Sequence, residues 1–213
     1  MNSVCGDLYP EITQYVKQRV SELEQIPTDR KSLLEQLSAC LRQCGTERRP
    51  AALTFICTHN SRRSQFAQIW AQIAAAYYGV EQVTAFSGGT EVTRFHPGTV
   101  AALQRCGVRF RLPAEAHPNP HYTISFSDNG VPLIGFSKIF NLPPNPADRY
   151  CAIMTCSQAD QSCPAAAGCE SRLAIPYEDP GSSDGTALES ATYNERCAQI
   201  AREMLYVMSR VQT

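Results

Sequence analysis

The stretch Leu53-Thr-Phe-Ile-Cys-Thr-His-Asn-Ser-Arg-Arg-Ser-Gln65 decides the fold of this chain. Residues 53–56 form a short apolar run rich in β-prone side chains, which predicts a buried strand that ends at Cys57. From Phe66 onward the apolar residues recur at helical spacing, which predicts a helix over 62–78. A tight polar loop separates the two elements, begins with Cys57 and ends in Arg63 and Ser64, so its pattern is Cys-x5-Arg-Ser.

This pattern is typical of a loop that holds a tetrahedral oxyanion. Backbone N–H groups of the loop and of the following helix can face one anion, and the same positive field favours Cys57 as the nucleophilic thiolate. The planar guanidinium of Arg63 can hold two anion oxygens. We therefore expect Cys57 to be a nucleophile. The residues expected to bind the oxyanion are Thr58, His59, Asn60, Ser61, Arg62, Arg63 and Ser64. The alternative is a small buried cysteine at a strand end, beside exposed arginines.

Length and charge limit the class of protein. A chain of 213 residues is long enough for one α/β domain with an appendage. The net charge of -1 and the pI of 6.4 argue against a nucleic-acid or membrane surface. No apolar run approaches the roughly 18 residues of a membrane span. The first residues lack the basic and apolar regions of a signal peptide, so we expect a cytoplasmic protein.

The chain contains ten cysteines, which in a reducing compartment are more often free, metal-binding or redox-active than structural disulfides. No Cys-x2-Cys pair occurs, and the four histidines do not sit at ligand spacing with cysteines. We therefore expect no metal and no cofactor. Cys40 and Cys44 lie one helical turn apart and are expected to pack in the core.

The remaining pattern alternates strands and helices. Two amphipathic stretches, 10–26 and 28–45, predict a helical hairpin in residues 1–50, which must bury its apolar faces against the main domain or a second copy. Strands are predicted over 83–86, 150–155 and 173–175, and helices over 97–106 and 187–211. This order predicts an α/β fold with a parallel sheet in residues 51–213.

Residues 113–146 depart from that rhythm. They are rich in proline at both ends, and Asn129-Gly130 stands between β-prone runs, which is a strong signal for a β-hairpin. We interpret this stretch as an insertion beside the active-site loops. Two roles are open, a lid over the site and an inert surface hairpin.

A second group of polar residues follows the strand predicted over 150–155. Cys156 and Cys163 would lie about 10.5 Å apart along a helix, whereas a disulfide needs Cα atoms within about 7 Å. The pair is therefore either a redox switch in a segment that unwinds or two unrelated thiols. Asp179, before Pro180, is a candidate proton donor to a leaving oxygen, although Asp-Pro is also an ordinary turn.

Three motifs resemble those of a known superfamily. Cys57-Thr-His-Asn-Ser-Arg-Arg63-Ser64-Gln65, Ser87-Gly-Gly-Thr-Glu91 and Glu178-Asp179-Pro180 are similar to motifs of low-molecular-weight protein tyrosine phosphatases and of arsenate reductases built on their fold. Cys156-Ser-x-Ala-Asp-x-x-Cys163-Pro164 resembles the resolving-cysteine segment of thioredoxin-coupled arsenate reductases. The match covers residues 52–112 and 147–211. It implies a four-stranded parallel sheet flanked by helices.

The resemblance also implies a reaction. Cys57 would attack arsenate held by Arg63 and the loop amides, with Asp179 assisting the departure of water. Cys156 would attack Cys57 and release arsenite, and Cys163 would then take over the bond, leaving a disulfide for thioredoxin to reduce. The second hypothesis is a low-molecular-weight protein tyrosine phosphatase, with Cys57 as nucleophile and Asp179 as general acid, which hydrolyses phosphotyrosine or another phosphomonoester through a phosphocysteine. The third is a non-catalytic phosphate-binding module.

The chain departs from the family pattern at several positions. His59 and Arg62 are bulky where small residues are common, and Arg62 can attract an anion or narrow the mouth of the site. Gly181 stands where phosphatases of this type carry an aromatic residue. Cys169 is a further candidate for the resolving thiol.

Overall fold

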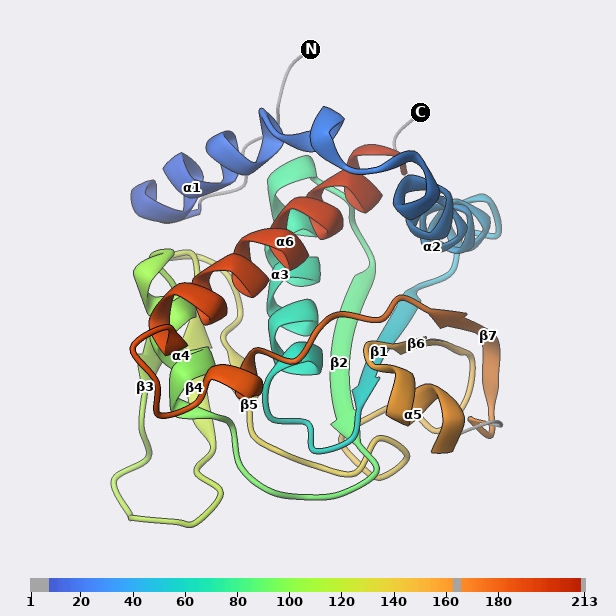
Figure 1. The fold of residues 1–213 in the computed structure, drawn as a ribbon. Coiled ribbons are helices and arrows are strands. Elements are labelled where there is room, and N and C mark those ends of the chain that lie inside the picture. The colour runs from blue at the N-terminus through green and yellow to red at the C-terminus, as the bar shows by residue number, and fades with distance from the viewer. Residues whose placement is uncertain (1–7, 163–165, 212–213) are drawn as a thin grey trace.

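The computed structural model describes residues 8–162 and 166–211 (Figure 1). Its α-helices are α1 (Pro10–Val20), α2 (Thr28–Thr46), α3 (Arg63–Tyr78), α4 (Pro97–Arg105), α5 (Ser157–Ser162) and α6 (Glu189–Ser209). Its strands are β1 (Ala51–Cys57), β2 (Val83–Gly89), β3 (Arg109–Arg111), β4 (Tyr122–Ser125), β5 (Leu133–Gly135), β6 (Tyr150–Met154) and β7 (Cys169–Ala174). Two short 3-10 helices are η1 (Leu23–Gln25) and η2 (Pro180–Ser183).

The main sheet has the order β2-β1-β6-β7, and every neighbouring pair is parallel. This arrangement confirms the predicted α/β fold with a four-stranded parallel sheet flanked by helices. The predicted elements are present with shifted ends. The helix predicted over 10–26 ends at Val20 and is followed by the separate 3-10 helix η1, and β7 begins at Cys169 rather than at residue 173. Because the strands are parallel, their carboxyl ends meet at one edge, where functional loops of such sheets gather.

Both faces of the sheet are buried, as the alternation along β6 shows. Cys151 and Ile153 belong to the large hydrophobic cluster that contains the cores of α3 and α6. Tyr150, Ala152 and Met154 point the other way, into a second cluster that includes Cys57 and Cys156. The apolar runs in these strands therefore reflect two covered faces, as is typical of parallel sheets.

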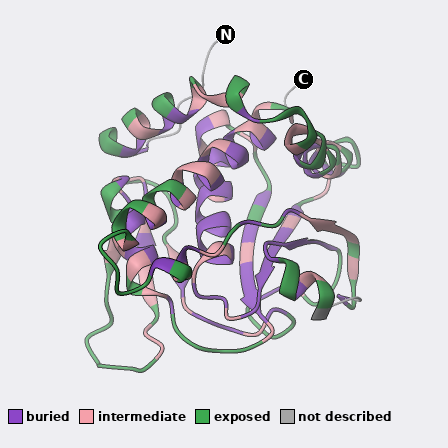
Figure 2. Ribbon diagram, viewed as in Figure 1, coloured by how far each residue is buried: buried purple, intermediate pink, exposed green. Residues whose placement is uncertain are grey.

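Helix α3 forms the centre of the large cluster. It is buried along nearly its whole length, and α6 crosses over it (Figures 1 and 2). Trp70 on α3 stacks on Tyr15 of α1 with ring centroids 5.4 Å apart, and its indole N–H contacts the Cys197 sulfur of α6 at 3.2 Å. The helix after the oxyanion loop is thus held on all sides, which fixes the position of its first turn.

Helices α1 and α2 dock on their own chain. Their apolar residues Ile12, Val16, Leu34 and Leu37 are fully buried in the large cluster. Both helices pack against α6, and the Arg30–Glu203 ion pair at 2.7 Å joins α2 to α6. The division of the chain at residue 50 stays a prediction, since the two parts share this hydrophobic cluster.

The predicted hairpin in residues 113–146 is confirmed, and it is larger than expected. Strands β4 and β5 pair antiparallel, and β3 adds to β4, so a separate three-stranded sheet forms. In the turn, the Gly130 N–H donates to the Ser127 hydroxyl at 2.9 Å. The β3–β4 connection is largely exposed (Figure 2), whereas the segment after β5 runs back to the oxyanion loop.

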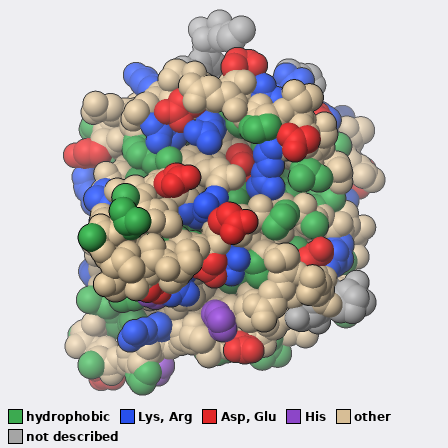
Figure 3. All heavy atoms as spheres, viewed as in Figure 1, with side chains coloured by type: hydrophobic (Ala, Val, Ile, Leu, Met, Phe, Trp, Pro, Cys, Tyr) green, Lys and Arg blue, Asp and Glu red, His purple; other side chains and the backbone are tan. Residues whose placement is uncertain are grey.

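The molecular surface carries both signs of charge. On the face seen in Figure 3, Lys and Arg side chains lie interspersed with Asp and Glu side chains. Across residues 8–162 and 166–211, no helix combines the length and the apolar character that crossing a membrane requires.

Candidate active site

The Cys-x5-Arg-Ser loop lies at the carboxyl edge of the main sheet, between the last residue of β1 and the first residue of α3. The buried Cys57 Sγ is 3.1 Å from the Ser64 hydroxyl. Asn60 has a φ of 46°, in the left-handed region, and its side-chain amide donates to the same hydroxyl at 2.9 Å. These contacts join the start, the middle and the end of the loop, so the loop is a closed cradle beside the sulfur.

The carbonyl groups of the loop point away from that cradle. Each of four successive carbonyls accepts a hydrogen bond from outside or from the helix. The bonds are Glu91 N–H to Thr58 O (2.9 Å), Ser137 Oγ to His59 O (2.8 Å), Gln65 Nε2 to Asn60 O (3.0 Å) and His96 N–H to Ser61 O (3.1 Å). Within the described part of the chain, no hydrogen bond uses the N–H of residues 59–62 as donor. These N–H groups are therefore available to an anion.

Arg63 lies between the cradle and the segment that contains Asp179. Its Nη2 donates to Asp179 Oδ2 at 2.6 Å and its Nη1 to the Tyr177 carbonyl at 3.3 Å. Among the described residues, the buried Nε of Arg63 has no hydrogen-bond partner. A buried guanidinium N–H without a partner is costly, and an oxyanion in the cradle would satisfy it.

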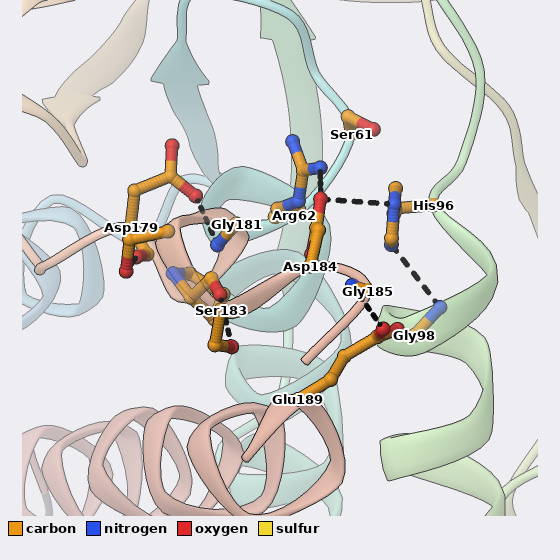
Figure 4. A network of polar contacts seen from close by, with 12 residues as sticks. Ser61, Arg62, His96, Gly98, Asp179, Gly181, Ser183, Asp184, Gly185 and Glu189 are labelled. Carbon is orange, nitrogen blue, oxygen red and sulfur yellow. Dashed lines mark hydrogen bonds and ion pairs between the residues drawn. The ribbon is translucent and has the colours of Figure 1, made fainter. Parts of the chain in front are cut away.

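The side chains of three predicted oxyanion residues make their contacts elsewhere. His59 faces Glu91 with Nε2 and Oε2 3.5 Å apart, and the Ser61 hydroxyl donates to the Arg94 carbonyl at 2.6 Å. Arg62 turns to Asp184 (Figure 4). His59, Ser61 and Arg62 can therefore bind an anion through their backbone N–H groups, while their side chains contact other residues.

The Arg62 side chain is held in a polar network with Asp184 and His96, beside Gly181 (Figure 4). Its Nη2 donates to Asp184 and its Nε donates to the Tyr193 hydroxyl at 2.5 Å. Tyr193 in turn donates to Asp184 Oδ1 at 2.7 Å and stacks on His96. A Cβ atom at Gly181 would lie 2.9 Å from Arg62 Cζ, so the guanidinium occupies the space beside this glycine.

Protonation in this network follows from its contacts. His96 Nδ1 accepts from the Gly98 N–H at 3.1 Å, which assigns the ring proton to Nε2, 3.4 Å from Asp184. Burial and then the Arg62 cation lower the pKa of His96. Burial opposes ionisation of Asp184, but the hydrogen bond from Tyr193 and the Arg62 cation leave its pKa lowered overall. Burial raises the pKa of Tyr193. The network therefore holds a neutral histidine, a carboxylate and a neutral phenol.

The insertion supports the oxyanion loop, which the sequence did not predict. The Lys138 N–H donates to Asn60 Oδ1 at 3.0 Å, and Gln65 Nε2 donates to the Phe136 carbonyl at 2.9 Å. The Gly88-Gly89 pair is the sequence signal for this contact. A Cβ at Gly88 would lie 2.2 Å from Phe140 Cα, and one at Gly89 would lie 2.6 Å from the Thr58 carbonyl oxygen. Only glycine admits such close backbone approach.

The side chain of Lys138, whose backbone N–H contacts Asn60, is a buried cation. Its Nζ lies 4.7 Å from the centroid of the Phe136 ring, and burial lowers its pKa to about 8. His96, Tyr193 and Asp184 were likewise not predicted. His96 alone had a local signal, since it precedes Pro97 at a helix start and caps α4.

Cys156 lies against the oxyanion loop from the side of β6. Its side chain is 1 % exposed and its Sγ is 3.7 Å from the Thr58 hydroxyl. The N–H of Ala159, in the first turn of α5, donates to the same sulfur at 3.3 Å. Cys163 lies outside the described residues. Cys169 begins β7, opposite the first residue of β6, and so lies at the amino end of the sheet. It packs against the hydrophobic cluster that contains Cys57 and Cys156, and its role as a resolving thiol stays a prediction.

Among residues 8–162 and 166–211, no group of three or more His, Cys, Asp and Glu side chains could hold a metal ion.

No family model and no curated protein matches the chain, whereas several solved structures do. A low-molecular-weight phosphotyrosine phosphatase from Vibrio cholerae O395 is 17% identical, with 76% of this chain and 97% of that chain covered and a TM-score of 0.48. A mutant of YwlE from Bacillus subtilis is 14% identical over 76% and 99% of the two chains, with a TM-score of 0.49. An arsenate reductase in the oxidized state is 22% identical over 75% and 98%, with a TM-score of 0.48. These include the two classes that the motifs resemble. At these scores the likeness bears on neither substrate nor mechanism.

Proposed function

We propose that the protein is an arsenate reductase in which Cys57 is the nucleophile and Cys156 is the second thiol of a disulfide relay. The observation that carries this proposal is the position of Cys156. It is buried in the same small hydrophobic cluster as Cys57 and touches Thr58, the residue that follows Cys57. The Ala159 N–H donates to the Cys156 sulfur at 3.3 Å, which fixes the position of this side chain. A phosphatase needs no second thiol at this place.

The first step uses the cradle. The Cys57 thiolate attacks the arsenic atom of hydrogen arsenate and forms a sulfur–arsenic bond. One arsenic–oxygen bond breaks, and the hydroxyl leaves as water with a proton from Asp179. The N–H groups of residues 59–62 and the Arg63 guanidinium stabilise the charge on the remaining oxygens. The buried Arg63 Nε, which has no hydrogen-bond partner among the described residues, supports this role.

The second step is the reduction. The Cys156 thiolate attacks Cys57 Sγ, and the sulfur–arsenic bond breaks with its electron pair remaining on arsenic. Arsenic is thereby reduced from As(V) to As(III) and leaves as arsenite, while Cys57 and Cys156 form a disulfide. Thiolate exchange by Cys163 would then restore Cys57. The role of Cys163 and the choice of thioredoxin as reductant are proposed on the motif resemblance alone. Reduction by thioredoxin would place the protein in the reducing cytoplasm.

The surroundings of Gly181 favour a small substrate. Arg62 fills the space beside Gly181, where tyrosine phosphatases carry an aromatic side chain. Arg62 is fixed there by Asp184 and Tyr193. An aryl group would therefore meet charged side chains instead of an aromatic wall, whereas a free oxyanion needs only the cradle.

Phosphomonoester hydrolysis is the second candidate function. The position of Asp179 favours it, because a carboxyl group next to Arg63 is the general acid that a departing alcohol requires. In that reaction Cys57 would form a phosphocysteine that water hydrolyses, and Cys156 would have no chemical role.

The test is consumption of NADPH by the purified protein with arsenate, thioredoxin and thioredoxin reductase, with p-nitrophenyl phosphate hydrolysis measured in parallel. We expect arsenate-dependent turnover that Cys156→Ser abolishes. The matched control is Cys106→Ser, a buried thiol of the core, which should retain turnover. Ester hydrolysis without arsenate-dependent oxidation, unchanged in Cys156→Ser, would instead establish a phosphatase.

A further inference from the structure

A second group of thiols lies between α2 and the main sheet, away from the oxyanion loop. Cys40 and Cys44 project from α2, and Cys151 lies on β6. Ser171 on β7 is the register partner of Cys151 and stands between two of the thiols. Its hydroxyl oxygen is 3.4 Å from Cys40 Sγ and 3.0 Å from Cys151 Sγ. One hydroxyl thus connects a helix thiol to a strand thiol.

The environments of these thiols differ. Cys40 is partly buried, whereas Cys44 and Cys151 are buried. A hydrogen bond from Cys151, together with Ser171 and the Arg49 cation, lowers the pKa of Cys40 despite its burial. The hydrogen bond with Cys40 and burial raise the pKa of Cys151, and burial raises that of Cys44. The pair therefore combines a partly exposed thiol whose pKa is lowered with a buried thiol whose pKa is raised.

We propose that Cys40 and Cys151 are a second redox site, at which hydrogen peroxide oxidises Cys40 and Cys151 then forms a disulfide with it. The geometry carries this proposal, because a partly exposed sulfur and a buried sulfur contact the same serine hydroxyl. The site does not depend on the proposed arsenate reduction. The disulfide would tie α2 to β6, the strand that leads to Cys156.

Formation of the Cys40–Cys151 disulfide consumes one molecule of hydrogen peroxide as the oxidant. The Cys40 thiolate attacks one peroxide oxygen, the oxygen–oxygen bond breaks, and a sulfenic acid and hydroxide form. The Cys151 sulfur then attacks Cys40 Sγ, a disulfide bond forms and the sulfenic oxygen leaves. The proton of Cys151 passes to that oxygen, for which Ser171 offers a path, so the second product is water.

The experiment is peptide mapping by mass spectrometry, without reduction, after the full chain is exposed to hydrogen peroxide. A Cys57→Ser background removes the proposed active-site nucleophile, so the result does not depend on the proposed function. We expect a Cys40–Cys151 linked peptide pair that dithiothreitol releases. The link should be absent in Cys40→Ser and present in the control Cys44→Ser, whose thiol lies one turn further along α2.

A second measurement needs no oxidant and tests the reactivity of Cys40 in the folded chain. Brief alkylation with N-ethylmaleimide at neutral pH should label Cys40 at least about tenfold faster than Cys44, because the thiolate is the reactive form. Equal labelling of the two would overturn the proposal. So would a peroxide-induced link between Cys106 and Cys197, whose sulfurs are 3.7 Å apart in the core, without any Cys40–Cys151 link.

Discussion

Two neighbouring arginines join the oxyanion loop to residues 179–184, and their surroundings differ. Arg62 contacts Asp184, which also faces His96 (Figure 4). The Tyr193 hydroxyl contacts both Arg62 and His96 and closes the network. Arg63 pairs with Asp179, a carboxylate that is 39% exposed, while its own side chain is 14% exposed. Its Nε is buried without a partner among the described residues. The Arg62–Asp184 pair is joined by further hydrogen bonds from Tyr193, whereas the Arg63 guanidinium keeps one N–H without a partner among the described residues.

This difference is our reason for proposing Arg63 as the catalytic arginine and Arg62 as a structural one. In the Arg62 network, each contact supports the next, so the guanidinium cannot turn to a ligand without breaking several hydrogen bonds. The Arg63 Nε–H, which has no partner in the described part of the chain, can bind an oxyanion while the guanidinium keeps its contact with Asp179. Arg62 and Arg63 are the same residue type at adjacent positions, so the residues that each one contacts decide its proposed role.

The largest expected effect is that of Arg63→Lys. Lysine keeps the charge but cannot hold two oxygens in a plane, so kcat/KM for arsenate should fall by about 100-fold or more. The melting temperature should change little, because the buried Nε–H of wild-type Arg63 has no partner among the described residues and lysine can keep an ion pair with Asp179. Steady-state kinetics and thermal unfolding of the same preparation check both parts. Near-normal kcat/KM in the lysine variant would place the anion elsewhere.

The reverse pattern is expected for Arg62→Lys. Lysine cannot contact Asp184 and Tyr193 in the same way, so the free energy of unfolding should fall by about 1–2 kcal/mol. The kcat/KM for arsenate should change by less than about tenfold, because the backbone N–H groups of the loop remain. Urea unfolding and kinetics distinguish the two effects, with Asp184→Asn as the matched variant from the other side. A large loss of activity at unchanged stability would assign Arg62 to substrate binding.

The smallest expected effect concerns pH and His96. Its pKa is lowered in the folded chain by burial and by Arg62, so near pH 6 the unfolded chain binds more protons. The stability contributed by neutral His96 is complete above the unfolded pKa of about 6.5 and is lost as pH falls below it.

The comparison variant is His96→Asn, which keeps an acceptor at the start of α4 but does not titrate. Chemical unfolding at about pH 7.5 and about pH 5.5 should show the stability advantage of the wild type over this variant narrowing at the lower pH. A constant difference between the two proteins would mean that the pKa of His96 is not lowered.

Much of the fold follows from local patterns in the sequence. The apolar run before Cys57, the helical spacing after Phe66 and Asn129-Gly130 each predicted the element that is found. The pairing of β3 with β4 was not predicted, because Arg109–Arg111 is too short to show a period. The anchoring of the loop by Phe136 and Lys138 uses their backbone groups, which every residue carries, so these two side chains give no sign of it, and the sequence signal lies in Gly88-Gly89 instead.

The sequence by itself determined the Cys-x5-Arg-Ser loop, the parallel α/β order and the candidates Cys57, Arg63, Asp179 and Cys156. These depend on neighbours along the chain, whose spacing sets strand, turn and helix directly. Only the tertiary structure decided that Arg62 turns to Asp184, that Cys156 touches Thr58 and that Cys40 shares Ser171 with Cys151. Such contacts join segments far apart in the sequence, and their geometry exists only once the hydrophobic clusters have packed.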